Sequence, residues 1–98
     1  MSTLMTAEFF VKPEKVDEFM GLLKGALPDT RGFAGCESVY VHVNQDDPGH
    51  LFVLGKWGHR SQHETYFAWR IESGMIDALE PFLTAPLKIS YYDEHPEI

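Results

Sequence analysis

Hydrophobic residues follow two different rhythms along the first part of this chain, and these rhythms predict its elements. From Thr3 to Lys12 apolar side chains alternate along both faces of the segment, which is typical of a β-strand. From Pro13 to Leu27 apolar positions instead return every three or four residues, which is typical of a helix with one buried face. Pro28 is expected to end this helix, because proline disrupts a helix interior.

The middle of the chain predicts a hairpin of two strands. In Cys36–Asn44 valines alternate with polar residues, and in Leu51–Trp57 apolar residues again share one face. The loop 45–49 between them is polar and contains proline and glycine, which favour a turn. We expect residues 29–35 to form an irregular connection between the helix and the hairpin.

The last third predicts a second helix and a final strand. Ser61 and Glu64 fit a capping box, in which each side chain bonds the backbone N–H of the other, so a helix is expected to begin there. A short helical segment follows, and the last strand is expected over Ala85–Asp93. The tail 94–98 is expected to be mobile.

The order strand, helix, strand, strand, helix, strand predicts one α+β domain over residues 1–98. Its subunit would be ferredoxin-like, with an antiparallel four-stranded sheet. Two short helices can cover only one face of such a sheet, so the other face would expose several large apolar groups. A second copy packing sheet against sheet would cover them, and we therefore expect a homodimer.

Composition and charge narrow the possible partners. The chain has 98 residues, of which 44% are hydrophobic, and a formal net charge of −7. Nucleic acids and anionic membrane surfaces attract basic proteins, so this charge disfavours both. A single cysteine, Cys36, excludes an internal disulfide. Because no signal segment is recognisable either, we expect a cytoplasmic protein.

The histidines and glycines give no pattern typical of a cofactor site. The five histidines lack metal-site spacing, and only one cysteine accompanies them. No glycine-rich phosphate loop is present. We therefore expect neither a metal nor a nucleotide cofactor.

Several motifs together resemble the antibiotic biosynthesis monooxygenase family of the dimeric α+β barrel superfamily. The motifs are Thr30-Arg31, Gly35-Cys36, Trp57, the segment 69–74 and Pro86. The resemblance covers nearly the whole chain. It implies a dimeric α+β barrel and the oxidation of a small quinol or aromatic phenol by O₂ without metal or flavin.

The chain also departs from the family pattern. Many members carry a histidine nine residues after the tryptophan, where this chain has Tyr66. Oxygenase-like members often carry an asparagine where this chain has Val53. Haem-degrading relatives place an asparagine early in the first strand, and its absence here disfavours haem degradation. A non-catalytic dimer that binds a small apolar ligand is therefore the alternative function.

The candidate catalytic residues are His63, Tyr66 and His42. Histidine suits a base because it titrates near neutrality, whereas tyrosine, with a free pKa of about 10, suits a proton donor or a substrate hydrogen bond. The candidate substrate-binding residues are Trp57, Phe67, Trp69 and Arg70.

Helical spacing places four of these candidates on one face: His63, Tyr66, Phe67 and Arg70. They could converge on a cavity. Alternatively, Phe67 packs inward while His63 and Arg70 flank it in solvent, which the first-turn position of His63 favours. Polar residues alternating with valines favour a solvated or interface position for His42. Trp57 could be a cavity wall or a core residue.

Overall fold

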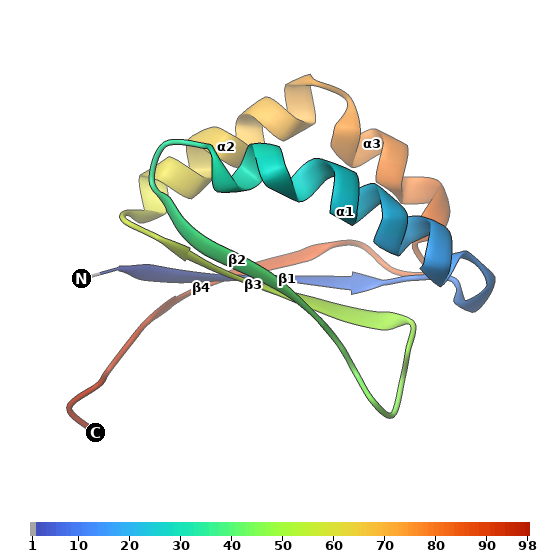
Figure 1. Ribbon diagram of the computed structural model, residues 1–98, viewed down its shortest axis with the longest axis horizontal. Coiled ribbons are helices and arrows are strands. Elements are labelled where there is room, and N and C mark those ends of the chain that lie inside the picture. Colours follow the sequence, from blue (N-terminus) through green and yellow to red (C-terminus); the bar gives the residue numbers. More distant parts are fainter. Residues whose placement is uncertain (1) are drawn as a thin grey trace.

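The computed structural model describes residues 2–98 as one antiparallel sheet with helices over one of its faces (Figure 1). The strands are β1 (Thr3–Phe10), β2 (Cys36–Val43), β3 (His50–Trp57) and β4 (Lys88–Asp93). The helices are α1 (Val16–Arg31), α2 (Arg60–Glu72) and α3 (Met75–Leu79). Single 3₁₀ turns occupy Pro13–Lys15 and Glu80–Phe82.

The strand order in the sheet is β2-β3-β1-β4, with every neighbouring pair antiparallel. Ala7 in β1 lies opposite Val53 in β3 and Ile89 in β4, so these three side chains share the face under the helices. This arrangement confirms the predicted α+β, ferredoxin-like subunit with a four-stranded antiparallel sheet.

The hydrophobic core lies between the sheet and the helices. Trp57, Phe19 and Leu51 are fully buried there. The Phe19 ring of α1 lies 5.2 Å from the ring of Phe9 and 5.9 Å from the ring of Phe82. These contacts join α1 to β1 and to the last helical turn, and so hold the layer of helices on the sheet.

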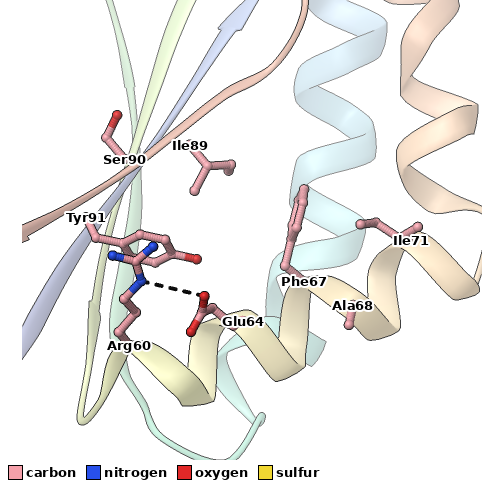
Figure 2. A pocket seen from close by; sticks show the side chains of 8 residues that line it. All are labelled: Arg60, Glu64, Phe67, Ala68, Ile71, Ile89, Ser90 and Tyr91. Atoms are coloured by element: carbon pink, nitrogen blue, oxygen red, sulfur yellow. Dashed lines mark ion pairs between the residues drawn. The ribbon is translucent and has the colours of Figure 1, made fainter.

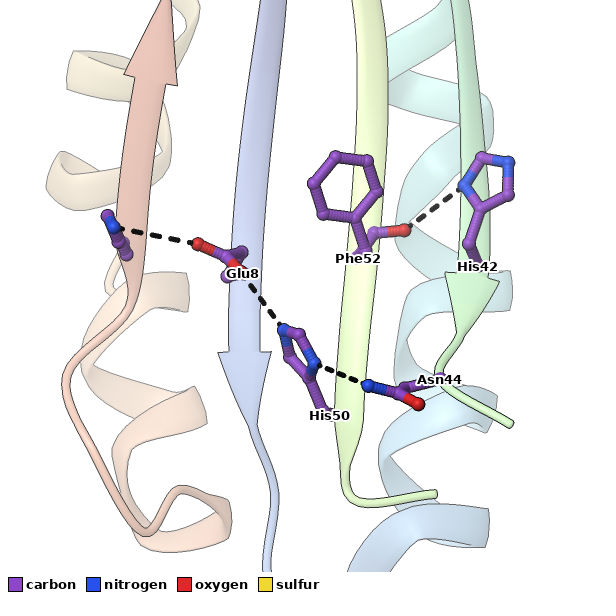
Figure 3. Close-up of polar contacts among 6 residues, drawn as sticks. Glu8, His42, Asn44, His50 and Phe52 are labelled. Atoms are coloured by element: carbon purple, nitrogen blue, oxygen red, sulfur yellow. Dashed lines mark hydrogen bonds and ion pairs between the residues drawn. The ribbon is translucent and has the colours of Figure 1, made fainter. Parts of the chain in front are cut away.

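The opposite side of the sheet, which we call the open sheet face, has no helix over it (Figure 1). Its apolar members are Leu4, Phe10, Tyr40, Phe52, Leu54 and Tyr92. Tyr40 is 63% exposed. A polar row crosses this face, in which Glu8 Oε1 lies 3.0 Å from His50 Nε2 and Glu8 Oε2 lies 3.9 Å from Lys88 Nζ (Figure 3).

The prediction that Pro28 ends the first helix was wrong. Helix α1 continues to Arg31 with Pro28 inside it, exposed on the solvent side. The carbonyl of Pro28 accepts a hydrogen bond from the Gly32 N–H at 3.1 Å, so the last turn is closed beyond the proline. As a consequence, Thr30 belongs to the helix and its side chain is buried.

The predicted capping box of Ser61 and Glu64 was also wrong. Helix α2 begins at Arg60, and the Gln62 side chain accepts a hydrogen bond from the His59 backbone N–H at 2.9 Å. The Glu64 carboxylate instead lies 3.6 Å from the Arg60 guanidinium. The helix starts early because only two residues separate it from the end of β3.

Gly35, in the connection between α1 and β2, packs against the start of α2. Its φ is +94°, and a Cβ at this position would overlap the Gln62 side chain, so only glycine fits. The Gly35 carbonyl accepts a hydrogen bond from the Gly58 N–H at 2.9 Å. The connection after α1 is thereby attached to the link between β3 and α2.

The last strand begins at Lys88, later than the predicted Ala85. The segment before it contains Pro86, which has no N–H to donate to a neighbouring strand. An isolated bridge between Val11 and Leu83 joins this segment to the end of β1, and the Thr84 N–H and hydroxyl both donate hydrogen bonds to the Phe10 carbonyl.

Candidate functional site

A small cavity of about 70 Å³ lies between the helices and the sheet. Its walls are mostly apolar and come from α1, α2 and all four strands, for example Leu23, Val53 and Ile89. The polar side chains that line it are Thr30, His63, Tyr66 and Arg70. Apolar walls with a few converging polar groups are typical of ligand sites.

His63 is buried among aromatic rings and is only 1% exposed. Its Nδ1 shares a 2.7 Å hydrogen bond with the Tyr91 hydroxyl. The rings of Trp57, Tyr66, Phe67 and Tyr91 all have centroids within 6.0 Å of its own. Burial lowers the pKa of His63 from 6.5 to about 4. The imidazole is therefore neutral at neutral pH.

The expectation that His63 and Arg70 flank Phe67 in solvent was wrong, because both are buried. The short link after Trp57 sets the first turn of α2 directly over the end of the sheet, so His63 cannot turn outward. Tyr91 of β4 then closes over it.

Arg70 is held by neutral groups from both long helices. Its Nε donates to the Tyr66 hydroxyl at 2.8 Å. Its Nη2 donates to the Ala26 carbonyl at 2.9 Å and to Thr30 Oγ1 at 3.3 Å. Thr30 Oγ1 and the Tyr66 hydroxyl share a further hydrogen bond of 2.6 Å. We call these four residues the Arg70 network.

The charge of Arg70 has no carboxylate partner. Arg70 is 7% exposed, and none of the ion pairs found within residues 2–98 includes it. Its guanidinium does lie 4.5 Å from the Trp69 ring, which is a weaker interaction. Buried charges are normally paired. The cavity therefore contains a buried positive charge that no carboxylate of the described residues neutralises.

Trp57 is a core residue behind the polar side chains. Its ring lies 5.2 Å from His63 and 5.3 Å from Tyr66, but it is not among the residues that line the cavity. Its indole N–H lies beside Gly55. Among the residues that the structure describes, this nitrogen is the one buried side-chain polar atom without a hydrogen bond. Trp57 thus supports His63 and Tyr66 from below.

The structure brings four predicted site residues together at the cavity: His63, Tyr66, Phe67 and Arg70. It separates two others from them. Trp69 is 39% exposed and stacks on Phe33 at 5.8 Å, outside the cavity. His42 lies on the open sheet face, where its Nδ1 is 3.3 Å from the Phe52 carbonyl oxygen (Figure 3).

Thr30 and Tyr91 belong to the site but were not predicted from the sequence. Thr30 follows Leu23 and Leu27 at helical spacing, so a helix extended past Pro28 would have placed it on the buried face. Tyr91 alternates with Ile89 and therefore points to the helix side of the sheet. Its bond to His63 joins residues 28 positions apart, and no sequence signal reveals such a pairing.

A larger, open groove lies beside the cavity, between α2 and β4 (Figure 2). It has a volume of about 540 Å³. At one end the Arg60 guanidinium lies 4.2 Å from the centre of the Tyr91 ring and pairs with Glu64. Phe67 and Ile89 line both the groove and the cavity, so they stand between the two spaces.

The neutral state of buried His63 predicts a pH dependence of folding. Between about pH 6.5 and about pH 4 the unfolded chain binds a proton at this residue and the folded chain does not. The free energy of unfolding should therefore decrease as the pH falls through this window, by at most ~3 kcal/mol from His63. Urea unfolding at a series of pH values measures it.

Other groups also titrate in this range, so the comparison needs matched variants. His63→Gln should lose this part of the slope, whereas His42→Gln on the open sheet face should keep it. Equal slopes in the wild type and in His63→Gln would contradict a buried neutral imidazole.

Two structural findings concern metals and membranes. Within residues 2–98, no three His, Cys, Asp or Glu side chains lie close enough to share a metal ion. None of the described helices combines the length and the apolar character needed to cross a membrane.

Comparison with solved structures identifies the fold in other proteins. A conserved protein from Methanosarcina mazei Go1 is 25% identical with a TM-score of 0.87, over 97% of this chain and 94% of that one. An antibiotic biosynthesis monooxygenase is 23% identical with a TM-score of 0.83, over 98% and 100%. Rv0793 from Mycobacterium tuberculosis is 18% identical with a TM-score of 0.84, over 97% and 96%.

Sequence comparisons add the family. No curated protein sequence gives a significant match. The family model described as antibiotic biosynthesis monooxygenase matches residues 3–70, which is well over half of the chain. This match confirms the resemblance found in the sequence, and the chain belongs to the antibiotic biosynthesis monooxygenase family.

Proposed function

We propose that this protein is a cofactor-independent monooxygenase that oxidises a small quinol or aromatic phenol, bound as its anion, with O₂. Membership of the family supports a monooxygenase in general. One observation carries the finer proposal: an unpaired guanidinium, Arg70, and a neutral imidazole, His63, line the same apolar cavity.

The reaction needs an electron-rich substrate and no external reductant. A deprotonated phenol or aryl methylene donates an electron to O₂ far more readily than its neutral form. When a methylene carbon becomes a carbonyl, one oxygen atom enters the product and the other leaves as water, and the substrate supplies all four electrons. The protein must therefore provide a base, a dry cavity and a stabilised anion.

His63 and Arg70 fit these roles together rather than singly. With a pKa of about 4, His63 alone is a weak base for a phenol. The Arg70 guanidinium favours the phenolate over the phenol, because a fixed charge acts strongly in an apolar cavity. Tyr66 and Thr30 hold the guanidinium in place. Phe67 forms part of the wall.

The alternative function is binding of a small apolar ligand without catalysis. Two observations favour it. The Tyr66 hydroxyl already shares hydrogen bonds with Thr30 and Arg70, so it is engaged within the protein and not with a ligand. Val53, at a position often occupied by asparagine in oxygenase-like members, brings no hydrogen-bond donor to the cavity wall.

We also propose that the open sheet face pairs with a second copy of the chain. Partly exposed apolar side chains cover this face, and no element of residues 2–98 packs on it (Figure 1). A patch of this kind is more apolar than a monomer normally exposes. Self-complementary pairing about a two-fold axis is the commonest way to bury it.

Light scattering tests the homodimer. The wild type at micromolar concentration should give twice the chain mass of 11.2 kDa. Leu54→Glu, which places a charge in the middle of the open sheet face, should give the monomer mass. Lys24→Glu on α1 is the control and should remain dimeric. A wild-type mass of one chain would contradict the proposal.

Oxygen uptake tests the monooxygenase. Purified protein with a chelator should consume O₂ in the presence of reduced quinones or anthrones. Arg70→Gln should lower the rate about 10²-fold, because it removes the charge that stabilises the anion, and His63→Gln should lower it by a factor on the order of 10² to 10⁴. Arg70→Lys should retain part of the activity, and Lys24→Gln all of it.

The outcomes separate the two functions. If Arg70→Gln and His63→Gln both leave O₂ uptake unchanged, the assignment of these two residues to the active site would be contradicted. No uptake by the wild type, together with saturable quenching of tryptophan emission by the same compounds, would favour the binding protein.

A further inference from the structure

The cavity beside Arg70 and His63 is too small for the substrates that its chemistry favours. Its volume is about 70 Å³. An engineered apolar cavity of about 150 Å³ holds a single benzene molecule. An aromatic ring therefore enters only when part of the cavity wall moves, and the structure indicates which part.

Phe67 and Ile89 are the side chains that the cavity shares with the groove between α2 and β4. Figure 2 shows Phe67 projecting from α2 and Ile89 from β4 toward the space between these elements. Both side chains are only partly buried. A Phe67 ring that rotates would join the cavity to a groove of about 540 Å³, which falls within the range of ligand pockets.

The two spaces differ in charge. The cavity contains the unpaired Arg70. Among the described residues that line the groove, Arg60 is the only cation. It pairs with Glu64 and covers the Tyr91 ring, and the other lining side chains are mostly apolar. The cavity thus favours an anionic group, whereas the groove favours a neutral aromatic or apolar surface.

We propose that the α2–β4 groove is the outer half of the binding site and that Phe67 separates it from the inner half. The ligand is an aromatic compound of two or more rings. Its ionised hydroxyl lies against Arg70 and His63, and its neutral rings extend past Phe67 along Ile71. The assignment of the inner half rests on the proposed function, but ligand binding in the groove can be measured without any reaction.

Calorimetric binding of two phenols of different length tests the groove. The probes are 4-nitrophenol, which has one ring, and anthracen-1-ol, which has three. Ile71 is 52% exposed, so Ile71→Asp leaves the core intact while it places a charge on the groove wall. This variant should lower the affinity for anthracen-1-ol about tenfold. It should leave the affinity for 4-nitrophenol unchanged. Leu22→Ala, an exposed position on α1, is the control for both probes.

Stopped-flow binding tests Phe67. Phe67→Ala should speed association of both probes about tenfold, because the step that moves the ring is removed. Equal effects of Ile71→Asp on the two probes, or unchanged association in Phe67→Ala, would overturn the proposal.

If these binding results hold but O₂ is not consumed, the groove is supported as a binding site and the monooxygenase activity is contradicted. If O₂ is consumed but Ile71→Asp affects both probes equally, the monooxygenase activity is supported and the groove is contradicted as part of the binding site.

Discussion

The burial of Arg70 without a carboxylate is the constraint on which the site depends. The guanidinium is held by the Tyr66 hydroxyl, by Thr30 Oγ1 and by the Ala26 carbonyl, so α1 and α2 are joined across the cavity by a charged group with only neutral partners. This arrangement requires α1 to continue past Pro28, because Thr30 would otherwise lie in a loop. Burying a charge in this way is costly. An anionic ligand in the cavity would offset part of that cost.

His63 and Arg70 experience the same apolar surroundings with opposite results. Burial lowers the pKa of His63, so the imidazole gives up its proton and is neutral. Arginine keeps its proton in proteins, so Arg70 remains charged. The cavity therefore carries one positive charge and one neutral base. A phenol that transfers its proton to His63 would leave two cations and one anion together, whereas a phenolate from solution would neutralise Arg70 directly. The second route is electrostatically less demanding for binding, and His63 then serves as the base in the oxidation step.

The order of elements and the two faces of the sheet could be predicted from the sequence, because alternation and helical spacing are local patterns. The same alternation already grouped His42 with polar residues, and the structure places it on the open sheet face. Exposure of His63 was predicted wrongly because it depends on Tyr91, a residue from a distant strand. Thr30 was missed because proline usually ends a helix and here does not. Family membership could be recognised, but the converging groups required the tertiary contacts.

The ionisation of a bound phenol tests the electropositive cavity most directly. 4-Nitrophenol changes colour when it ionises, so its pKa can be measured by absorbance when it is free and when it is bound. An unpaired Arg70 predicts that binding to the wild type lowers this pKa, and that binding to Arg70→Gln does not. A phenol pKa that is unchanged or raised on binding to the wild type, as an uncharged apolar cavity would produce, would contradict the account.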